Sequence, residues 1–210
     1  MTSSVDYFQS HATKWDQMRK GFFSGEVATA AVSAAGLTQG QTAADIGAGT
    51  GFLTLEMCKH GTNVIAVDTS EAMLQQLRTN IPNQPVETRV GDAENLPIED
   101  SALDAVVANM CLHHVENPSA AIREMARVLK PGGKAVITDL TLHNFEWLLR
   151  EHNDRWPGFA HSDVSNWLTE AGFADVSIQQ LGQQCCATSC CSGAGASVEI
   201  FLARARKPLV

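Results

Sequence analysis

The sequence predicts a single α/β domain built on a doubly wound parallel sheet. From residue 36 onward, short apolar runs alternate with segments of helical spacing, which is the pattern of strands joined by crossover helices. Most of these runs are continuously apolar, as expected for strands that are buried on both faces. A chain of 210 residues suffices for one such domain and is short for two.

Seven runs are candidates for the strands of this sheet. Five of them fall at residues 42–46, 63–67, 86–90, 103–108 and 135–140. Two further runs, 174–181 and 197–203, follow in the last third of the chain and are joined by a cysteine-rich loop. Because ligands of doubly wound sheets bind at the carboxyl ends of the strands, we expect the functional site at that edge.

The predicted helices have their own sequence signals. Residues 1–35 are predicted to be helical, and a helix begins near Pro118 and stops before 131–133, the Pro-Gly-Gly run. Two more helices are expected at 143–153 and 161–171. The first segment carries apolar and aromatic side chains at Tyr7, Phe8, Trp15, Phe22 and Val27.

Composition and charge narrow the class of ligand. The formal net charge is -8 and the 15 basic residues are scattered, which argues against a nucleic-acid substrate. The one basic cluster, residues 204–207, is expected to be a solvated tail. No apolar stretch is long enough to cross a membrane and no secretory signal is visible, so a cytoplasmic protein with reduced cysteines is expected. The partner is therefore predicted to be a small molecule.

A glycine-rich turn follows the first predicted strand. Gly47, Gly49 and Gly51 allow a tight turn and close approach of the backbone to a ligand. In a dinucleotide-binding turn the third glycine would come one residue later, where Phe52 stands. Asp45 lies two positions before the first glycine, where a carboxylate would repel a pyrophosphate and attract an ammonium group. The turn thus favours a cationic nucleoside ligand over a dinucleotide.

Two more carboxylates follow the next two strands. Asp68 closes the second strand, where a carboxylate can accept from both hydroxyls of a ribose. Asp92 closes the third, where it can accept from an exocyclic amine of adenine. Each aspartate alone could instead cap a helix. Three at successive strand ends favour the ligand site.

Five ordered motifs resemble those of class I S-adenosyl-methionine-dependent methyltransferases, over roughly residues 12–205. They are residues 45–51, 67–70, 91–93, 112–115 and 127–133. The resemblance implies a Rossmann-like sheet of seven strands with the last one antiparallel, and S-adenosyl-methionine as cofactor. It also implies that 1–35 form a helical lid on a cofactor-binding domain, 36–210.

The resemblance assigns the cofactor contacts residue by residue. The loop Gly47, Ala48, Gly49, Thr50 and Gly51 would contact the methionine part and the ribose, Asp68 with the adjoining Thr69 the ribose, Asp92 and Ala93 the adenine, and Asn109 the methyl end. Trp15 and Arg19 would belong to the lid, although Trp15 could equally pack in the core.

Methyl transfer mainly requires alignment of the acceptor with the donor and exclusion of water, with a general base only where the acceptor must lose a proton early. The candidates for such catalytic groups are His114, Asp139 and His143, at the ends of the fourth and fifth strands. Packing or helix capping is the alternative interpretation of His113 and His114. Asp139 and His143 form either a polar acceptor pocket or a solvated helix start.

The cysteines suggest one possible acceptor. Cys185, Cys186, Cys190 and Cys191 fall within seven residues, and Cys111 follows the fourth strand on the same expected edge. Such thiols can bind a metalloid or soft metal as substrate, and arsenite methyltransferases of the same superfamily use cysteines in comparable places. Structural zinc, redox switching or plain packing are the alternative interpretations.

Three functions therefore remain open for the sequence. The first is methylation of a small molecule, such as a thiol-bound metalloid or soft metal ion, arsenite being an example. The second is carbon or oxygen methylation of a quinone-type or other biosynthetic intermediate. The third is a cofactor-binding or metal-sensing module without turnover. Nothing in the sequence predicts an oligomeric state.

Overall fold

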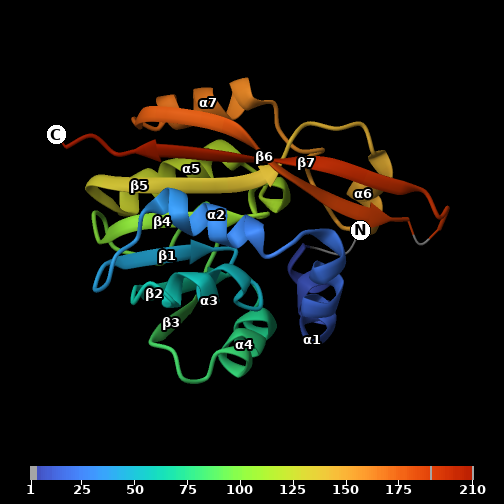
Figure 1. Ribbon diagram of the computed structural model, residues 1–210, viewed down its shortest axis with the longest axis horizontal. Helices are drawn as coiled ribbons and strands as arrows, with labels where there is room; N and C mark the ends of the chain where they lie inside the picture. The colour runs from blue at the N-terminus through green and yellow to red at the C-terminus, as the bar shows by residue number, and fades with distance from the viewer. Residues whose placement is uncertain (1–3, 190, 210) are drawn as a thin grey trace.

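The computed structural model describes residues 4–189 and 191–209, which form a sheet with helices on both faces (Figure 1). The strand order is β3-β2-β1-β4-β5-β7-β6. The strands are β1 (Thr42–Ile46), β2 (Asn63–Asp68), β3 (Val86–Val90), β4 (Leu103–Asn109), β5 (Leu129–Leu140), β6 (Ala174–Thr188) and β7 (Gly195–Arg206). β7 runs antiparallel to its neighbours β5 and β6, whereas the other adjacent strands are parallel to one another. The predicted Rossmann-like, seven-stranded sheet with an antiparallel last strand is confirmed.

The helices follow the predicted alternation, with some changes of length. They are α1 (Ser4–Phe22), α2 (Glu26–Ala35), α3 (Phe52–Cys58), α4 (Glu71–Asn80), η1 (Leu112–His114), α5 (Pro118–Val128), α6 (Glu146–Glu151) and α7 (His161–Glu170). The helix expected at 143–153 is shorter, because Asn144 and Phe145 adopt irregular backbone before it begins. At the start of α5, the side chain of Asn117 accepts from the backbone N–H of Ala120, as an N-cap residue does.

The two faces of the sheet carry separate apolar layers. On one face, Ile46 and Val106 pack with α5 and α7. On the other face, Ala43 and Val107 pack with α2 and α3. Neighbouring residues of one strand thus serve opposite faces, as the two-residue period of a strand requires. This explains why the central strands β1, β2 and β4 are largely apolar.

Within residues 4–35 the chain forms two helices with different surroundings. The apolar side of α2 is fully buried against the sheet through Val27, Ala31 and Val32. Figure 1 shows α1 away from the two faces, beside α4 and off the ends of the strands. Of these two helices, α1 is therefore the one placed to cover the carboxyl edge of the sheet.

The last two strands are much longer than the sequence indicated. The predicted runs 174–181 and 197–203 extend to Thr188 and back to Gly195, so the hairpin projects past the rest of the sheet (Figure 1). Residues of β6 alternate between half-buried and exposed, except that Gln179 and Gln180 are both exposed. The prediction of a cysteine-rich loop is therefore wrong for Cys185 and Cys186. Both lie within β6, on opposite sides of the strand.

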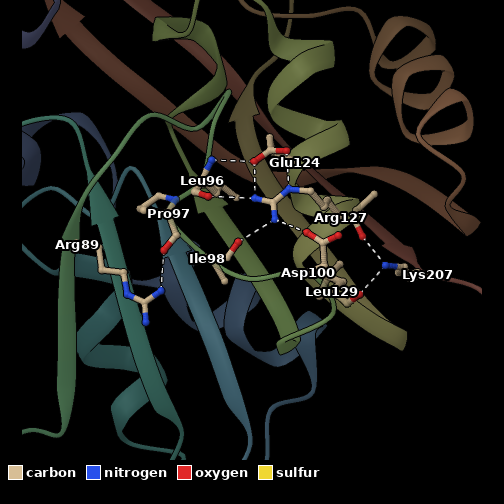
Figure 2. A network of polar contacts seen from close by, with 10 residues as sticks. Arg89, Leu96, Pro97, Ile98, Asp100, Glu124, Arg127, Leu129 and Lys207 are labelled. Atoms are coloured by element: carbon tan, nitrogen blue, oxygen red, sulfur yellow. Dashed lines mark hydrogen bonds and ion pairs between the residues drawn. The ribbon is translucent and has the colours of Figure 1, made fainter.

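The basic cluster 204–207 is not a solvated tail. Arg204 and Arg206 belong to β7, and the ammonium group of Lys207 donates to the carbonyl oxygens of Ala126 and Leu129 at 2.8 and 2.6 Å (Figure 2). Lys207 therefore satisfies carbonyl groups at the end of α5, where a cation is favoured. No helix in the described part of the chain has the length and apolar character needed to cross a bilayer.

Candidate active site

A cavity of about 370 Å³ lies at the carboxyl ends of β1, β2 and β4, beneath α1. Every predicted cofactor residue lines it except Gly51. Gly51 begins α3 with a φ of 94°, and a Cβ at this position would lie 2.9 Å from Cγ of Leu77. The third glycine of the turn is therefore needed for the packing of α3 on α4. The other two line the cavity.

The glycine turn brings backbone to the cavity wall. Gly47 and Gly49 have φ angles of 69° and 53°, a region that residues with a Cβ rarely adopt. A Cβ on Gly47 would lie 2.5 Å from the sulfur of Cys111, in the loop after β4. The turn and the Cys111 loop are thus in direct contact, and only glycine fits between them.

Two carboxylates stand beside this turn. Asp45 is 1% exposed and accepts from the hydroxyl of Thr54 at 2.6 Å, and its burial raises its pKa to about 7. Asp68 accepts from the backbone N–H groups of Gly49 and Ser70, both at 2.8 Å, and burial raises its pKa too. No Lys or Arg among the described residues forms an ion pair with either group. We call Asp45, the 47–49 turn and Asp68 the glycine-loop end of the cavity.

The segment after β3 is held in place by a neighbouring helix. Asp92, with an exposed side chain, accepts from the backbone N–H of Glu94 at 2.9 Å. Figure 2 shows the guanidinium of Arg127 on α5 donating to the carbonyl oxygens of Leu96 and Ile98, at 3.0 and 2.8 Å. Arg127 also binds the carboxylates of Glu124 and Asp100, as Figure 2 likewise shows. This network fixes the strand exit that carries Asp92 and Ala93.

Helix α1 is attached to the glycine turn by Asp16. Its carboxylate accepts from the hydroxyl of Thr50 at 2.6 Å and from the amide of Asn80 on α4 at 2.8 Å. Trp15 lies beside the same turn, with its Nε1 atom 3.8 Å from the position of a Cβ on Gly49. Asp16 was not among the predicted site residues, because one acidic residue in a polar helix carries no signal of its partner.

Arg19 is the basic residue of α1 at the cavity wall. Its guanidinium lies 4.1 Å from the ring centroid of Phe52, and burial lowers its pKa. Its Nε atom is buried and has no hydrogen-bond partner among residues 4–189 and 191–209. An acceptor such as a ligand carboxylate would satisfy this donor.

The opposite end of the cavity is built from histidines and aspartates. Nδ1 of His113 lies 2.6 Å from Asp139, whose carboxylate also accepts the backbone N–H groups of Leu112 and Leu140. On the other side, Nε2 of His113 lies 3.8 Å from Oδ1 of Asp154, and Nδ1 of His114 lies at the same distance from that oxygen. We call His113, His114, Asp139 and Asp154 the histidine end.

Burial and charge act on these groups in opposite directions. Burial alone would lower the pKa of His113, but the charge and hydrogen bond of Asp139 and the charge of Asp154 raise it to about 9. The pKa of His114 falls well below its usual value, through burial and the nearby His113. Burial raises the pKa of Asp154 to about 6. The neighbouring histidines thus differ in charge near neutral pH.

Of the three predicted catalytic residues, one lines the cavity and two do not. His114 lines the cavity, whereas Asp139 is 0% exposed and lies behind His113. His143 is not part of the wall, and its Nδ1 atom accepts from the backbone N–H of Phe145 at 3.1 Å. Asp154 lines the cavity but carried no sequence signal, since it belongs to an irregular polar segment between α6 and α7.

The predicted group of five thiols is not assembled by the described cysteines. Cys111 and Cys185 line the cavity, and burial raises the pKa of Cys111 well above its usual value and that of Cys185 to about 12. Cys186 faces away, with its sulfur 3.7 Å from the hydroxyl of Ser197, and Cys191 is exposed in the hairpin turn. Cys190 lies outside the described residues.

Comparison with known proteins identifies the family of this chain. Residues 44–137 match the model of a methyltransferase domain. A demethylmenaquinone methyltransferase from Renibacterium salmoninarum is 30% identical over 178 residues, covering 71% of this chain and 73% of that protein. The chain belongs to the class I S-adenosyl-methionine-dependent methyltransferases. The predicted enzyme class and the cofactor of the family are thereby confirmed.

Two further comparisons concern a second relative in sequence and a solved structure with the same fold. A chloroplastic 2-methyl-6-phytyl-1,4-hydroquinone methyltransferase 1 from Oryza sativa is 36% identical over 141 residues, 66% of this chain. The match spans only 42% of the length of that rice protein. A chain from the complex of the Haloferax volcanii Trm112 methyltransferase activator with a methyltransferase has the same fold, with a TM-score of 0.79, 20% identity and coverage of 96% of this chain and 97% of that one.

Proposed function

We propose that this chain methylates a small molecule with a hydroxylated ring, of the quinol type, using S-adenosyl-methionine. The observation that carries the proposal is that one cavity joins the glycine-loop end to the histidine end. Donor and acceptor can therefore lie in a single cavity, which is what alignment for an in-line displacement requires.

The glycine-loop end fits the cofactor by its chemistry. Asp45 is a buried carboxylate to which an ammonium group would supply the missing counter-charge, and Arg19 offers its unpartnered Nε to a carboxylate. Asp68 keeps lone pairs for ribose hydroxyls after accepting its two backbone N–H groups. When bound, S-adenosyl-methionine supplies an electrophilic methyl group on a sulfonium.

The exposed Asp92 and its neighbour Ala93 are assigned to adenine, and Asn109, whose amide oxygen accepts from Thr138 at 2.8 Å, to the methyl end. In this proposal α1 is the lid. Asp16 binds it to Thr50 of the glycine turn, so movement of α1 would open the cavity and disturb the turn together.

The acceptor side combines apolar walls with a few polar groups. Phe8 and Phe22 of α1, Leu148 of α6 and Val198 of β7 line the cavity. The rings of Phe8 and His114 meet edge to face, with centroids 4.9 Å apart. A planar ring suits such walls, and its hydroxyl groups can pair with the histidine end. The substrates in the names of the rice and Renibacterium relatives are also quinols or menaquinone precursors.

A thiol-bound metalloid is the second candidate acceptor, because Cys111 and Cys185 both line the cavity. Its binding would require thiolates, and burial keeps both thiols protonated at neutral pH. The remaining cysteines of the predicted group are placed elsewhere or outside the described residues. The quinol acceptor is therefore favoured.

The test is a methyl-transfer assay with product detection by mass spectrometry. The wild-type chain and a Cys111→Ser/Cys185→Ser variant are offered S-adenosyl-methionine with a methylated hydroquinone or with arsenite. We expect both proteins to methylate the hydroquinone. Methylation of arsenite alone, lost in the double variant, would overturn the quinol proposal. Binding of S-adenosyl-homocysteine without any transfer would instead favour a non-catalytic module.

A further inference from the structure

The histidine end contains three groups whose arrangement the methyl-transfer reaction does not require. One nitrogen of His113, one of His114 and one oxygen of Asp154 all lie within 4.8 Å of one another. We propose that they bind a divalent transition-metal ion with a preference for nitrogen and oxygen ligands, such as Zn²⁺ or Co²⁺. This ion site is separate from the cofactor contacts at the glycine-loop end.

The distances are close to those of a filled site. Zinc binds imidazole nitrogen and carboxylate oxygen at about 2.0–2.2 Å, so two ligands of a tetrahedral ion lie about 3.4 Å apart. The carboxylate oxygen of Asp154 is 3.8 Å from Nε2 of His113 and from Nδ1 of His114. Small rotations of these side chains would therefore bring all three atoms into bonding range.

Asp154 supplies the independent observation. It is 8% exposed, yet its carboxylate accepts no hydrogen bond from any described residue within normal distance. A buried carboxylate ordinarily has such a partner. The two imidazoles at 3.8 Å are too distant to supply it. A metal ion between the three groups would take the place of the proton on Nε2 of His113 and provide the missing interaction.

The surroundings of His113 match those of a metal-bound histidine. Asp139 accepts from its Nδ1 atom at 2.6 Å and is itself held by the backbone N–H groups of Leu112 and Leu140. A carboxylate behind a ligating imidazole fixes the ring and directs Nε2 at the ion. The contact from Nδ1 of His114 to the carbonyl of Asn153 is 3.4 Å long, so an ion can replace it at little cost.

Three protein ligands leave coordination positions open toward the cavity, as in catalytic rather than structural zinc sites. An acceptor hydroxyl bound there would lose its proton to solvent more easily, because the ion stabilises the resulting oxyanion. This use of the ion rests on the proposed function, whereas the binding of the ion does not.

The test is a titration of the metal-free chain with Co²⁺ and Zn²⁺, without cofactor or acceptor, followed by calorimetry and by the visible spectrum of cobalt. We expect one ion per chain. His114→Gln and Asp154→Asn should each weaken binding by at least about tenfold, and Asp139→Asn by about 10–100-fold. The matched controls His60→Gln and Asp163→Asn change exposed residues and should bind as the wild type does.

Three results would overturn the site. These are no stoichiometric binding, unchanged affinity in both His114→Gln and Asp154→Asn, or a cobalt–thiolate band that disappears when Cys185, Cys186, Cys190 and Cys191 are replaced by serine. Affinity for S-adenosyl-homocysteine, measured on the same samples, shows that each variant is folded. If no ion binds in the titration and the chain still methylates hydroquinone, the metal site fails alone; if the ion binds and no acceptor is methylated, the quinol proposal fails alone.

Discussion

The two ends of the cavity each contain a buried aspartate, and the fold satisfies them differently. Asp139, at the histidine end, accepts from His113 and from two backbone N–H groups. Asp45, at the glycine-loop end, accepts from Thr54 and faces no cationic side chain among the described residues. The first carboxylate is satisfied by the protein itself. The second has no cationic partner among the described residues, and burial raises its pKa to about 7.

This difference extends to the surroundings of each group. The glycine-loop end consists of a short turn and two strand ends, and its contacts are mostly to backbone. The histidine end joins side chains from η1, β5 and the segment before α7. One end is therefore expected to depend on ligand binding for its stability, and the other on side-chain interactions within the protein.

The largest effect is expected at the histidine end. Asp139→Ala removes the acceptor of three buried donors and leaves His113 without its partner, so the free energy of unfolding should fall by about 3–5 kcal/mol. Urea denaturation measures this loss. The control Glu87→Ala breaks an exposed ion pair with Arg89 and should cost less than about 1 kcal/mol. Equal losses in the two variants would contradict the role given to Asp139.

The second effect concerns Asp45 and pH. Its pKa is about 7 in the folded chain, against 3.8 for a free aspartate side chain. Between these two pH values, the folded state holds a proton that the unfolded state has lost. Stability of the ligand-free chain should therefore fall as pH rises from about 4 to about 7, by about 3–4 kcal/mol from this group. Urea denaturation across this range should show that Asp45→Asn removes that part of the fall. An identical pH dependence of stability in wild type and variant would contradict the assignment of this effect to Asp45.

The third effect tests the contact between the glycine turn and Cys111. Gly47→Ala adds a Cβ 2.5 Å from the Cys111 sulfur at a φ of 69°, and should cost about 2–4 kcal/mol. Gly172→Ala is the matched control, since it has a φ of 88° and open space around it, and should cost about 1–2 kcal/mol. The difference in thermal stability isolates the steric contact, and its absence would show that the turn can move away.

The smallest effect is expected at Arg127, which lies outside both ends of the cavity. Arg127→Met removes the donors that hold the segment after β3, and should cost about 1–2 kcal/mol and weaken S-adenosyl-homocysteine binding a few-fold. Arg123→Met, on the same helix, changes an exposed residue and should alter stability by less than about 0.5 kcal/mol. Calorimetry and denaturation of the pair measure both quantities.

The glycine-loop end was largely predictable from the sequence because its determinants are local. A turn, the aspartate before it and the aspartates that close the next strands occur in order along the chain, and a parallel sheet brings strand ends together. The strands β1 and β3 were predicted at their observed bounds for the same reason. The local sequence pattern is sufficient for both strands, although the three central residues of β3 are polar.

The histidine end was only partly predictable because it depends on distant segments. Asp154 approaches His113 through an irregular loop, and nothing in its neighbours distinguishes it from a solvated aspartate. Cys185 and Cys186 looked alike in sequence, but the extension of β6 places them on opposite sides of the strand. Asp16 of α1 meets Thr50 across 34 positions of the chain. Such contacts are set by tertiary packing and not by local pattern.

The central claim is that one end of the cavity binds the cofactor and the other serves the acceptor. The most direct test measures two quantities in Asp68→Ala and His114→Gln: calorimetric affinity for S-adenosyl-homocysteine and the rate of methyl transfer to the hydroquinone. Asp68→Ala should weaken the affinity by about 100-fold, as loss of hydrogen bonds to a charged group implies, and should lose transfer with it. His114→Gln should keep wild-type affinity and lose transfer. Equal losses of affinity in both variants, or full transfer in His114→Gln, would contradict the account.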